Sequence, residues 1–235
     1  MKILFDSYSN VCAGLSERVD GSMTWWNTKP IDPLVKERRD HFFEKQGIEP
    51  TRVVSGGLIH GNHTVVVGEQ EAGEYLLDTD ALVTQTPNVF LTITVADCLP
   101  VFFYDSVTLS VGIAHAGWKG MIKGVLESVV CTFQEAFDSH PSDIQVVIGP
   151  YIQSCHFEVQ QDVAAEFNVR CVERRDHNLF VNLGTEAKQR LNKVGVQNIS
   201  IDSMCTFDIP SRFFSARRDK MSPIQGMVAF IGLKS

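Results

Sequence analysis

Several signatures of common binding and redox sites are absent from the sequence. It contains no CxxC pair, no GxxxxGK[ST] loop and no GxGxxG motif after an apolar run. The two glycine-rich motifs hold the phosphates of nucleotides, so nucleotide binding by these common routes is not supported. Without paired cysteines, a closed four-cysteine structural zinc site is not expected either.

Long apolar runs and an excess of positive charge are also missing. Asp6 interrupts the apolar opening residues, and no later run approaches the roughly 20 residues that a membrane-spanning helix needs. Lysine and arginine number 21 against 28 acidic residues, which gives a net charge of -7. We expect a soluble, cytoplasmic protein without general affinity for nucleic acid or membranes, in which local arginine clusters can still bind small anions.

The six cysteines lie far apart and follow no secretory signal. A disulfide framework is therefore not expected, and most of these thiols are predicted to be small buried side chains. They are Cys12, Cys98, Cys131, Cys155, Cys171 and Cys205.

The apolar fraction, 44% of 235 residues, is enough for a sizeable core. Neither a linker nor an internal repeat is visible, and predicted strands outnumber predicted helices without strict alternation of the two. We expect a single domain over residues 1–235, of the mixed α/β class, with mixed β-sheets flanked by helices.

Apolar periodicity and turn residues predict the elements. Helices are predicted at 34–46, with Asp32 as the cap and Pro33 in the first turn, and at 119–137, 159–167 and 185–194. Residues 7–29 are rich in Gly, Ser and Asn and are predicted to form an irregular lid or substrate loop. Strands are predicted at 2–5, 65–67, 76–84, 89–95, 99–104, 109–114, 144–148, 199–201 and 227–233.

The strands at 99–104 and 109–114 form a predicted hairpin with a polar turn at 105–108. If the turn is centred between residues 106 and 107, Cys98 lies directly opposite His115 and both side chains point to one face. A shift of the strand pairing by one residue would place the two side chains on opposite faces of the sheet. Pro100 cannot donate a ladder hydrogen bond, so the first strand is expected at a sheet edge or with a bulge.

Cys98 and His115 together are the best candidate for a reactive pair. A buried cysteine alone is more often a packing residue. His115, however, ends an apolar strand on the face of Val111 and Ile113, where an imidazole needs a polar partner. A thiol and an imidazole so placed suit two ligands of one metal or a nucleophile and its base.

His60, in the glycine-rich segment SGGLIHGNH at 55–63, is the natural third member of this group. Two histidines and one cysteine form a ligand set of catalytic zinc, which keeps a fourth position open, and blue copper uses the same residue types. A multicopper oxidase is disfavoured because the chain has seven histidines and no HxH pair. His63 is interpreted as an exposed loop residue. The remaining histidines are predicted to be structural or on the surface: His41, His140, His156 and His177.

Arginines supply candidate anion-binding groups, because a guanidinium matches the geometry of phosphate or carboxylate. Arg39 lies on the first predicted helix, and Arg217 and Arg218 lie in the segment RFFSARRDK with Arg212. The alternative for each is a solvated surface position.

The motifs resemble those of the laccase-domain family of the YfiH type. They are IHG at 59–61, TDALVT at 79–84, TVADCLPVFFYD at 94–105, GIAHAGWKG at 112–120, IGPYIQSCHFEV at 148–159 and CTFDIPSRFFSARRD at 205–219. The resemblance implies a mixed α/β fold similar to Cys-His catalytic domains of deamidating toxins. It also implies that His60, Cys98 and His115 are the metal-binding and catalytic trio.

Three positions depart from the family pattern. Leu58 stands where the family usually has glutamine, and Gln225-Gly226 stands where it has a Gly-Arg pair. Of the N-terminal family pattern, only Gly14-Leu15-Ser16 remains. If these positions bind substrate, an altered substrate range or weaker activity is expected.

Members of the family were once considered multicopper polyphenol oxidases and are now considered zinc-dependent purine nucleoside phosphorylases. The resemblance implies phosphorolysis of adenosine, inosine, guanosine and methylthioadenosine, with adenosine deamination as a side activity. Zinc would be held by the trio, and Arg39 with Arg217 or Arg218 would place phosphate, in a monomer or small homo-oligomer. Two alternatives stay open: a Cys98–His115 thiol amidase acting on a peptidoglycan precursor, and a binding protein without turnover.

Overall fold

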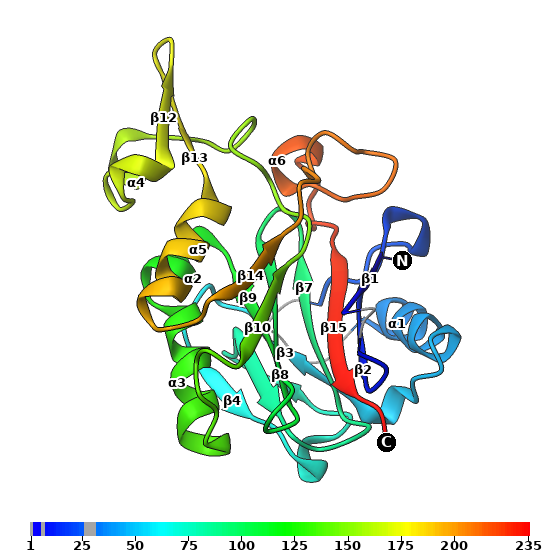
Figure 1. Ribbon diagram of the computed structural model, residues 1–235. Helices are drawn as coiled ribbons and strands as arrows, with labels where there is room; N and C mark the ends of the chain where they lie inside the picture. Colours follow the sequence, from blue (N-terminus) through cyan, green and yellow to red (C-terminus); the bar gives the residue numbers. More distant parts are fainter. Residues whose placement is uncertain (1, 6–7, 26–31) are drawn as a thin grey trace.

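The computed structural model describes residues 2–5, 8–25 and 32–235 (Figure 1). Two six-stranded sheets form the body, and a small three-stranded sheet lies apart from them. In sheet order, the first contains β1 (Lys2–Leu4), β2 (Val11–Leu15), β15 (Met227–Leu233), β7 (Phe90–Val95), β3 (Val53–Gly56) and β5 (Tyr75–Leu76). The second contains β14 (Asn198–Ile201), β10 (Ile144–Ile148), β8 (Leu99–Asp105), β9 (Ser110–Ala116), β6 (Ala81–Thr84) and β4 (Thr64–Val66).

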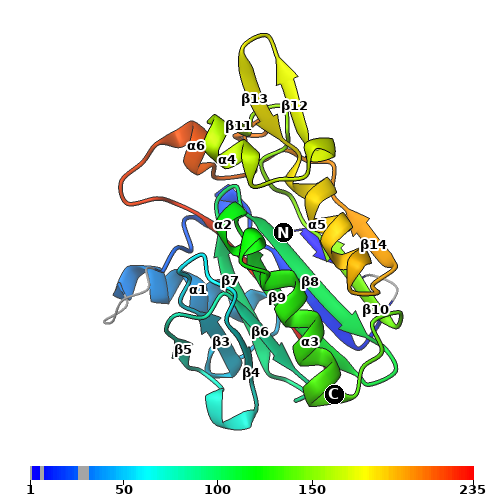
Figure 2. The same ribbon diagram turned by 90° about the vertical axis from the view of Figure 1, so that its left-hand side faces the viewer.

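The two large sheets pack face to face, and helices cover their outer faces. The helices are α1 (Pro33–Lys45), α2 (Trp118–Ile122), α3 (Val125–Phe137), α4 (Gln161–Ala165), α5 (Leu183–Lys193) and α6 (Ala216–Asp219). Helix α1 packs on the first sheet, whereas α3 and α5 pack on the second (Figures 1 and 2). The small sheet, β11 (Glu158–Val159), β13 (Asn178–Val181) and β12 (Val172–Arg175), projects from this body.

Side-chain alternation along β9 assigns its two faces. Val111 and Ile113 pack between the sheets, whereas Ala114 packs toward α3. Because alternate residues of a strand share a face, His115 points to the space between the sheets, as the sequence predicted.

Several predicted elements are confirmed. Asp32 caps α1 by accepting a hydrogen bond from the Leu34 amide, and β10 and β15 have the predicted bounds. None of the helices in the described ranges is long and apolar enough to cross a membrane. The expected mixed α/β class is also observed.

Other expectations were wrong. Within the segment predicted to be irregular, β2 is an almost fully buried strand between β1 and β15; residues 7 and 26–29 of that segment lie outside the described residues. The single strand expected at 76–84 is divided between β5 and β6, which belong to different sheets, with Asp78 at φ 55 between them. The helix expected at 119–137 breaks at Gly124, whose φ of 88 ends α2 and precedes α3. Such left-handed conformations interrupt regular elements.

Pro100 lies in an interior strand, not at an edge, because β8 is paired with both β9 and β10. Its carbonyl accepts from the Gly149 amide just beyond the end of β10. The missing N–H of Pro100 therefore falls where the ladder with β10 stops.

All six cysteines are free thiols, in agreement with the expectation of no disulfide framework. Only Cys171 and Cys205 are buried, however, whereas Cys131 and Cys155 are exposed and the other two are half-buried. The expectation that most would be buried was wrong.

The close packing of α3 on β9 gives a testable prediction. A Cβ at Gly112 would lie 2.8 Å from Phe133 Cε2 and 3.1 Å from Val83 Cγ1. We expect Gly112→Ala to lower the free energy of unfolding by about 1–3 kcal/mol through overpacking, as measured by urea denaturation. The control is Gly68→Ala, whose Cβ would meet nothing closer than Glu71 Oε2 at 3.6 Å; equal losses for the two variants would contradict the prediction.

Candidate active site

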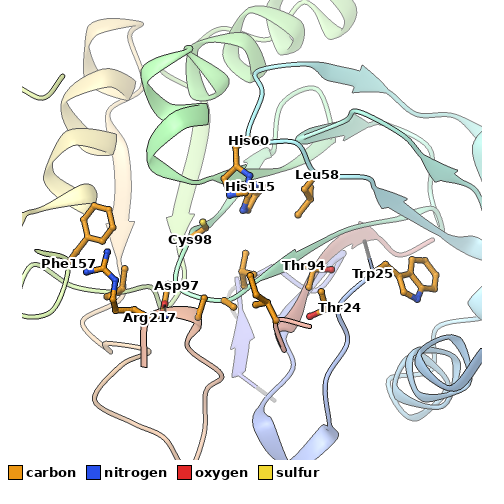
Figure 3. A pocket seen from close by; sticks show the side chains of 15 residues that line it. Thr24, Trp25, Leu58, His60, Thr94, Asp97, Cys98, His115, Phe157 and Arg217 are labelled. Atoms are coloured by element: carbon orange, nitrogen blue, oxygen red, sulfur yellow. Dashed lines mark hydrogen bonds between the residues drawn. The ribbon is translucent and has the colours of Figure 1, made fainter. Parts of the chain in front are cut away.

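His60, Cys98 and His115 come together at one end of the two large sheets. Cys98 directly precedes β8, His115 lies in β9, and His60 lies in the loop between β3 and β4. One ligand atom from each lies within 4.8 Å of the other two, and Figure 3 shows the three side chains pointing toward one another. His115 is buried, Cys98 is half-buried and His60 is exposed, so the group has one side open to a ligand.

The pairing of β8 with β9 differs by two residues from the predicted register. Pro100, not Cys98, lies opposite His115, so the expectation that Cys98 directly faces His115 was wrong. The loop has the predicted four residues but lies one residue later, at 106–109, because Asp105 pairs with Ser110 and its carboxylate accepts from the Val107 and Thr108 amides. A shift of two residues leaves every side chain on its predicted face, so Cys98 and His115 still meet as diagonal neighbours.

Asp80 is the buried carboxylate that holds the two histidines in place. It accepts hydrogen bonds from the backbone amides of Ile59, His60 and Gly61 at 3.1, 3.0 and 2.8 Å. It also bonds to His115 Nδ1 at 2.9 Å. The other ring nitrogen of His115 is thereby left for Cys98, an arrangement that orients imidazole ligands in metal sites and catalytic bases in triads.

Asp80 was not predicted as a site residue, although it belongs to the TDALVT motif. Its partners lie about 20 and 35 residues away, and nothing in the sequence alone pairs it with them. The only local signal is a carboxylate directly before a buried strand, a position where charge needs a partner.

In the metal-free protein, the pKa values of Cys98 and His115 are strongly shifted. Burial alone would raise the pKa of Cys98, but the attraction of His115 and His60 outweighs it and lowers that pKa to about 6. Burial alone would lower the pKa of His115, but the Cys98 thiolate and Asp80 outweigh it and raise that pKa to about 10. At neutral pH the pair is therefore a thiolate and an imidazolium.

Because Gly117 has no side chain, there is room beside it for Cys98 and His60. A Cβ there would lie 2.9 Å from Cys98 Sγ and 2.9 Å from His60 Cδ2. A Cβ at Gly120 would lie 2.8 Å from the Gly61 carbonyl oxygen. The segment that starts α2 thus packs against the His60 loop at distances that only glycine allows.

The donor set fits a zinc ion. Two imidazoles and one thiolate are ligands of catalytic zinc sites, and Asp80 behind His115 supplies the carboxylate that commonly supports a ligating histidine. The same types also bind copper.

A cavity of about 410 Å³ opens over the trio. Figure 3 shows Phe157 and Arg217 at one end and Trp25 at the other. Its lining combines aromatic, apolar, hydroxyl and cationic side chains, a composition typical of small-molecule sites. The residues are Thr24, Trp25, Leu58, His60, Thr94, Val95, Ala96, Asp97, Cys98, His115, Ile152, Phe157, Ala216, Arg217 and Ile224.

Of the three candidate arginines, only Arg217 is among the described residues that line this cavity. Its Nη1 donates to the Glu158 carbonyl at 2.8 Å, and its guanidinium lies 5.4 Å from the Phe157 ring centroid. Arg218 instead donates hydrogen bonds to the backbone carbonyls of Thr206 and Phe207. It also donates to the Phe213 carbonyl and to the Asp219 carboxylate.

Arg39 is buried beneath Trp25, with its guanidinium 4.1 Å from the indole centroid. It donates to the Met23 carbonyl and to the hydroxyls of Ser55 and Thr92. Burial lowers its pKa to about 9, so the side chain is still a cation at neutral pH. The structure therefore places Arg39 behind the cavity wall.

Asp97 joins the strand end that carries Cys98 to the segment that carries Arg217. Its φ of 87 is in the left-handed region, which non-glycine residues adopt only when their surroundings require it. The carboxylate accepts from Thr206 Oγ1 at 2.6 Å, Ser215 Oγ at 2.9 Å and the Arg217 amide at 2.8 Å. The sequence suggested only a nearby carboxylate, because these partners lie more than 100 residues away.

A family model described as multi-copper polyphenol oxidoreductase laccase matches residues 26–234. The chain belongs to this family. Members with other names are similar over most of its length. Purine nucleoside phosphorylase YlmD of Bacillus subtilis is 35% identical over 222 residues, which cover 86% of this chain and 78% of that protein. Purine nucleoside phosphorylase YfiH of Escherichia coli is 33% identical over 208 residues, which cover 85% of this chain and 81% of that protein.

Crystal structures of other members share the fold. YlmD from Geobacillus stearothermophilus superposes with a TM-score of 0.89 at 25% identity, covering 98% of this chain and 94% of that one. The Bacillus licheniformis hypothetical protein YfiH gives 0.87 at 30% identity, with 95% and 93% covered. The family and the fold class expected from the motifs are thus confirmed.

The electrostatics of the trio predict the pH dependence of Cys98 alkylation. Because its pKa is lowered to about 6, the reactive thiolate is present above that pH and is lost as the pH falls through it. In metal-free protein we expect the iodoacetamide rate at Cys98, normalised to its own plateau, to fall by half near pH 6.

Cys131 is an internal control for this experiment. It is exposed, and Glu135 raises its pKa above the usual value, so its rate should still be rising at pH 9. Peptide mass spectrometry reports both sites in one sample. Parallel profiles for the two cysteines would contradict the thiolate–imidazolium pair.

Proposed function

We propose that this protein is a purine nucleoside phosphorylase whose active site is built on His60, Cys98 and His115. The observation that carries the proposal is the placement of the trio, backed by Asp80, at the floor of a cavity of about 410 Å³. The names of the relatives point to the same activity. We take residues 1–235 as one catalytic unit.

The cavity suits a nucleoside and an anion together. Trp25 and Phe157 offer aromatic surfaces for a base, and Thr24 and Thr94 offer hydroxyls for a ribose. The indole N–H of Trp25 is buried and has no hydrogen-bond partner among the described residues, so it can donate to a base acceptor. Arg217 is the proposed phosphate ligand.

The trio would hold one zinc ion, with copper as the second candidate. Zinc bound there supplies a Lewis acid with an open coordination position. Asp80 accepts a hydrogen bond from His115 Nδ1 and fixes the ring, so the other nitrogen keeps its direction. Arg217 orients phosphate for attack at the anomeric carbon, and Leu58 and Ile152 exclude water around it.

Adenosine, inosine, guanosine and methylthioadenosine are the proposed substrates. Adenosine deamination is proposed as a side activity in the same cavity. Leu58 lines the cavity where glutamine is usual in the family, so substrate preference is expected to be set partly at this position.

The decisive assay is incubation of metal-loaded protein with inosine and phosphate, followed by quantification of hypoxanthine and ribose 1-phosphate. We expect phosphate-dependent release of both products and none with Cys98→Ala, because this change removes a member of the trio. The control is Cys131→Ala, which alters an exposed thiol outside the cavity. Equal product with Cys98→Ala, or none with the unaltered protein, would reject the proposal.

Removing the arginine should separate phosphate binding from nucleoside binding. We expect Arg217→Gln to lower kcat/KM for phosphate by about 10- to 100-fold, the usual range for a lost charge-assisted contact. The KM for inosine should change far less. The matched control is Arg170→Gln at an exposed position outside the cavity. An unchanged phosphate dependence in Arg217→Gln would contradict the assignment.

A second candidate function is thiol hydrolysis of an amide, such as a peptidoglycan precursor. It is favoured by the Cys98 thiolate, His115 and Asp80, which form a nucleophile–base–carboxylate series. One equivalent of zinc per chain that is present in the unaltered protein and lost in Cys98→Ser, whatever zinc other residues bind, favours the phosphorylase. A metal-free protein with rapid alkylation of Cys98 favours the hydrolase.

A further inference from the structure

A second group of metal-ligating side chains lies outside the active-site trio. Cys155 and His156 come from the segment after β10, and Cys205 and Asp208 come from the segment after β14. Their ligand atoms all lie within 4.8 Å of one another. The sequence predicted His156 to be structural or on the surface, because neither segment alone shows a ligand pattern.

We propose that Cys155, His156, Cys205 and Asp208 bind a second, structural metal ion of the zinc type. Two thiolates, an imidazole and a carboxylate complete four-coordination from protein groups alone, as structural zinc sites do. The inference concerns residues that the active-site trio does not include, and it does not depend on the proposed function.

The distances match the edges of a zinc tetrahedron. With Zn–S of about 2.3 Å and Zn–N or Zn–O of about 2.0 Å, these edges are about 3.8 Å between sulfurs, 3.5 Å between sulfur and oxygen, and 3.3 Å between nitrogen and oxygen. Cys155 Sγ lies 3.7 Å from Cys205 Sγ and 3.5 Å from Asp208 Oδ2. His156 Nδ1 lies 3.3 Å from the other carboxylate oxygen, Asp208 Oδ1, so a four-coordinate site would use only one of these two distances to oxygen. The edge from Cys155 Sγ to His156 Nδ1 is 3.2 Å, against about 3.5 Å in a tetrahedron.

Neighbouring groups support the four ligands. The His156 ring stacks on Phe207, with centroids 4.0 Å apart and an interplanar angle of 13°, which fixes the direction of Nδ1. The Gln153 amide donates to Cys205 Sγ at 3.4 Å, a contact that stabilises a thiolate. Cys205 is buried whereas Cys155 and Asp208 are exposed, so an ion can enter from solvent.

A disulfide between Cys155 and Cys205 is the main competing arrangement. It would shorten the sulfur separation from 3.7 Å to about 2.05 Å and would leave His156 and Asp208 without a role. The gathering of all four donor atoms within 4.8 Å of one another favours the metal.

A metal ion at the second site would stabilise the segments that form the aromatic end of the cavity. Ile152 and Phe157 flank Cys155 and His156 in the sequence and both line the cavity. On the other segment, Thr206 lies next to Cys205 and donates to Asp97 at 2.6 Å. A metal joining the two segments therefore fixes the aromatic end of the cavity relative to the strand end that carries Cys98.

The test is the zinc content per chain, by elemental analysis, of full-length protein purified with zinc present and a reductant. The Cys98→Ser variant isolates the second site, and we expect it to retain one equivalent. Adding Cys155→Ser should abolish that equivalent, and adding Asp208→Asn should weaken zinc binding by about tenfold or more. The matched control is Cys98→Ser with Cys131→Ser, which should retain the full equivalent.

Cobalt provides a readout that does not depend on activity. Co²⁺ added to Cys98→Ser should give the visible bands of tetrahedral cobalt and a thiolate charge-transfer band, and Asp208→Asn should change them while the circular dichroism stays the same. Cys98→Ser protein without bound zinc or cobalt bands, or equal zinc content with and without Cys155→Ser, would overturn the proposal. A Cys155–Cys205 disulfide in freshly purified protein, detected as resistance of these two cysteines to alkylation after unfolding in the presence of a chelator, would also overturn it.

The zinc contents of these variants distinguish the absence of the second site from the absence of a metal at the active-site trio. If the trio holds no metal, the unaltered protein and Cys98→Ser bind the same amount of zinc, and Cys155→Ser still removes it. If the second site is absent, Cys98→Ser alone removes all bound zinc.

Discussion

The buried carboxylate of Asp80 is the group on which the candidate active site depends. A charge with no exposed surface is costly unless it is fully hydrogen-bonded. Here three backbone amides and one imidazole satisfy it. The loop around His60 must therefore curl around the carboxylate, and His115 must present its other nitrogen to Cys98. Removing the carboxylate would release two of the three functional side chains at once.

A second carboxylate, Asp97, orders the chain on the other side of Cys98 through the hydrogen bonds that it accepts. Asp80 organises the histidines, whereas Asp97 holds the segment that carries Arg217. Cys98 lies between these two carboxylates at the end of β8 and β9, whose residues are all buried. The site thus takes its rigidity from the sandwich, and its polar groups come from loops that the two carboxylates order.

Local sequence patterns predicted many of the strands and their faces. They did not predict features that depend on contacts between residues far apart in the sequence. The apolar runs gave β10 and β15 their bounds, and the alternation along β9 placed His115 on the correct face. The turn after Asp105 was placed one residue too early, because its position depends on hydrogen bonds from the Val107 and Thr108 amides to the Asp105 carboxylate. The roles of Asp80 and Asp97, and the cluster around His156, depend on partners brought near only by the fold.

The order of strands in the first sheet bears on how the chain folds during its synthesis. Strand β15 follows the other strands of this sheet in the sequence, lies between β2 and β7, and pairs with both. Until the ribosome has made it, the near-complete burial of β2 cannot be achieved and the strand keeps an unpaired edge, which is prone to wrong association. We therefore expect chaperones to bind nascent chains mainly before β15 emerges from the ribosome. Formation of the β8–β9 hairpin at an earlier stage would not change this expectation.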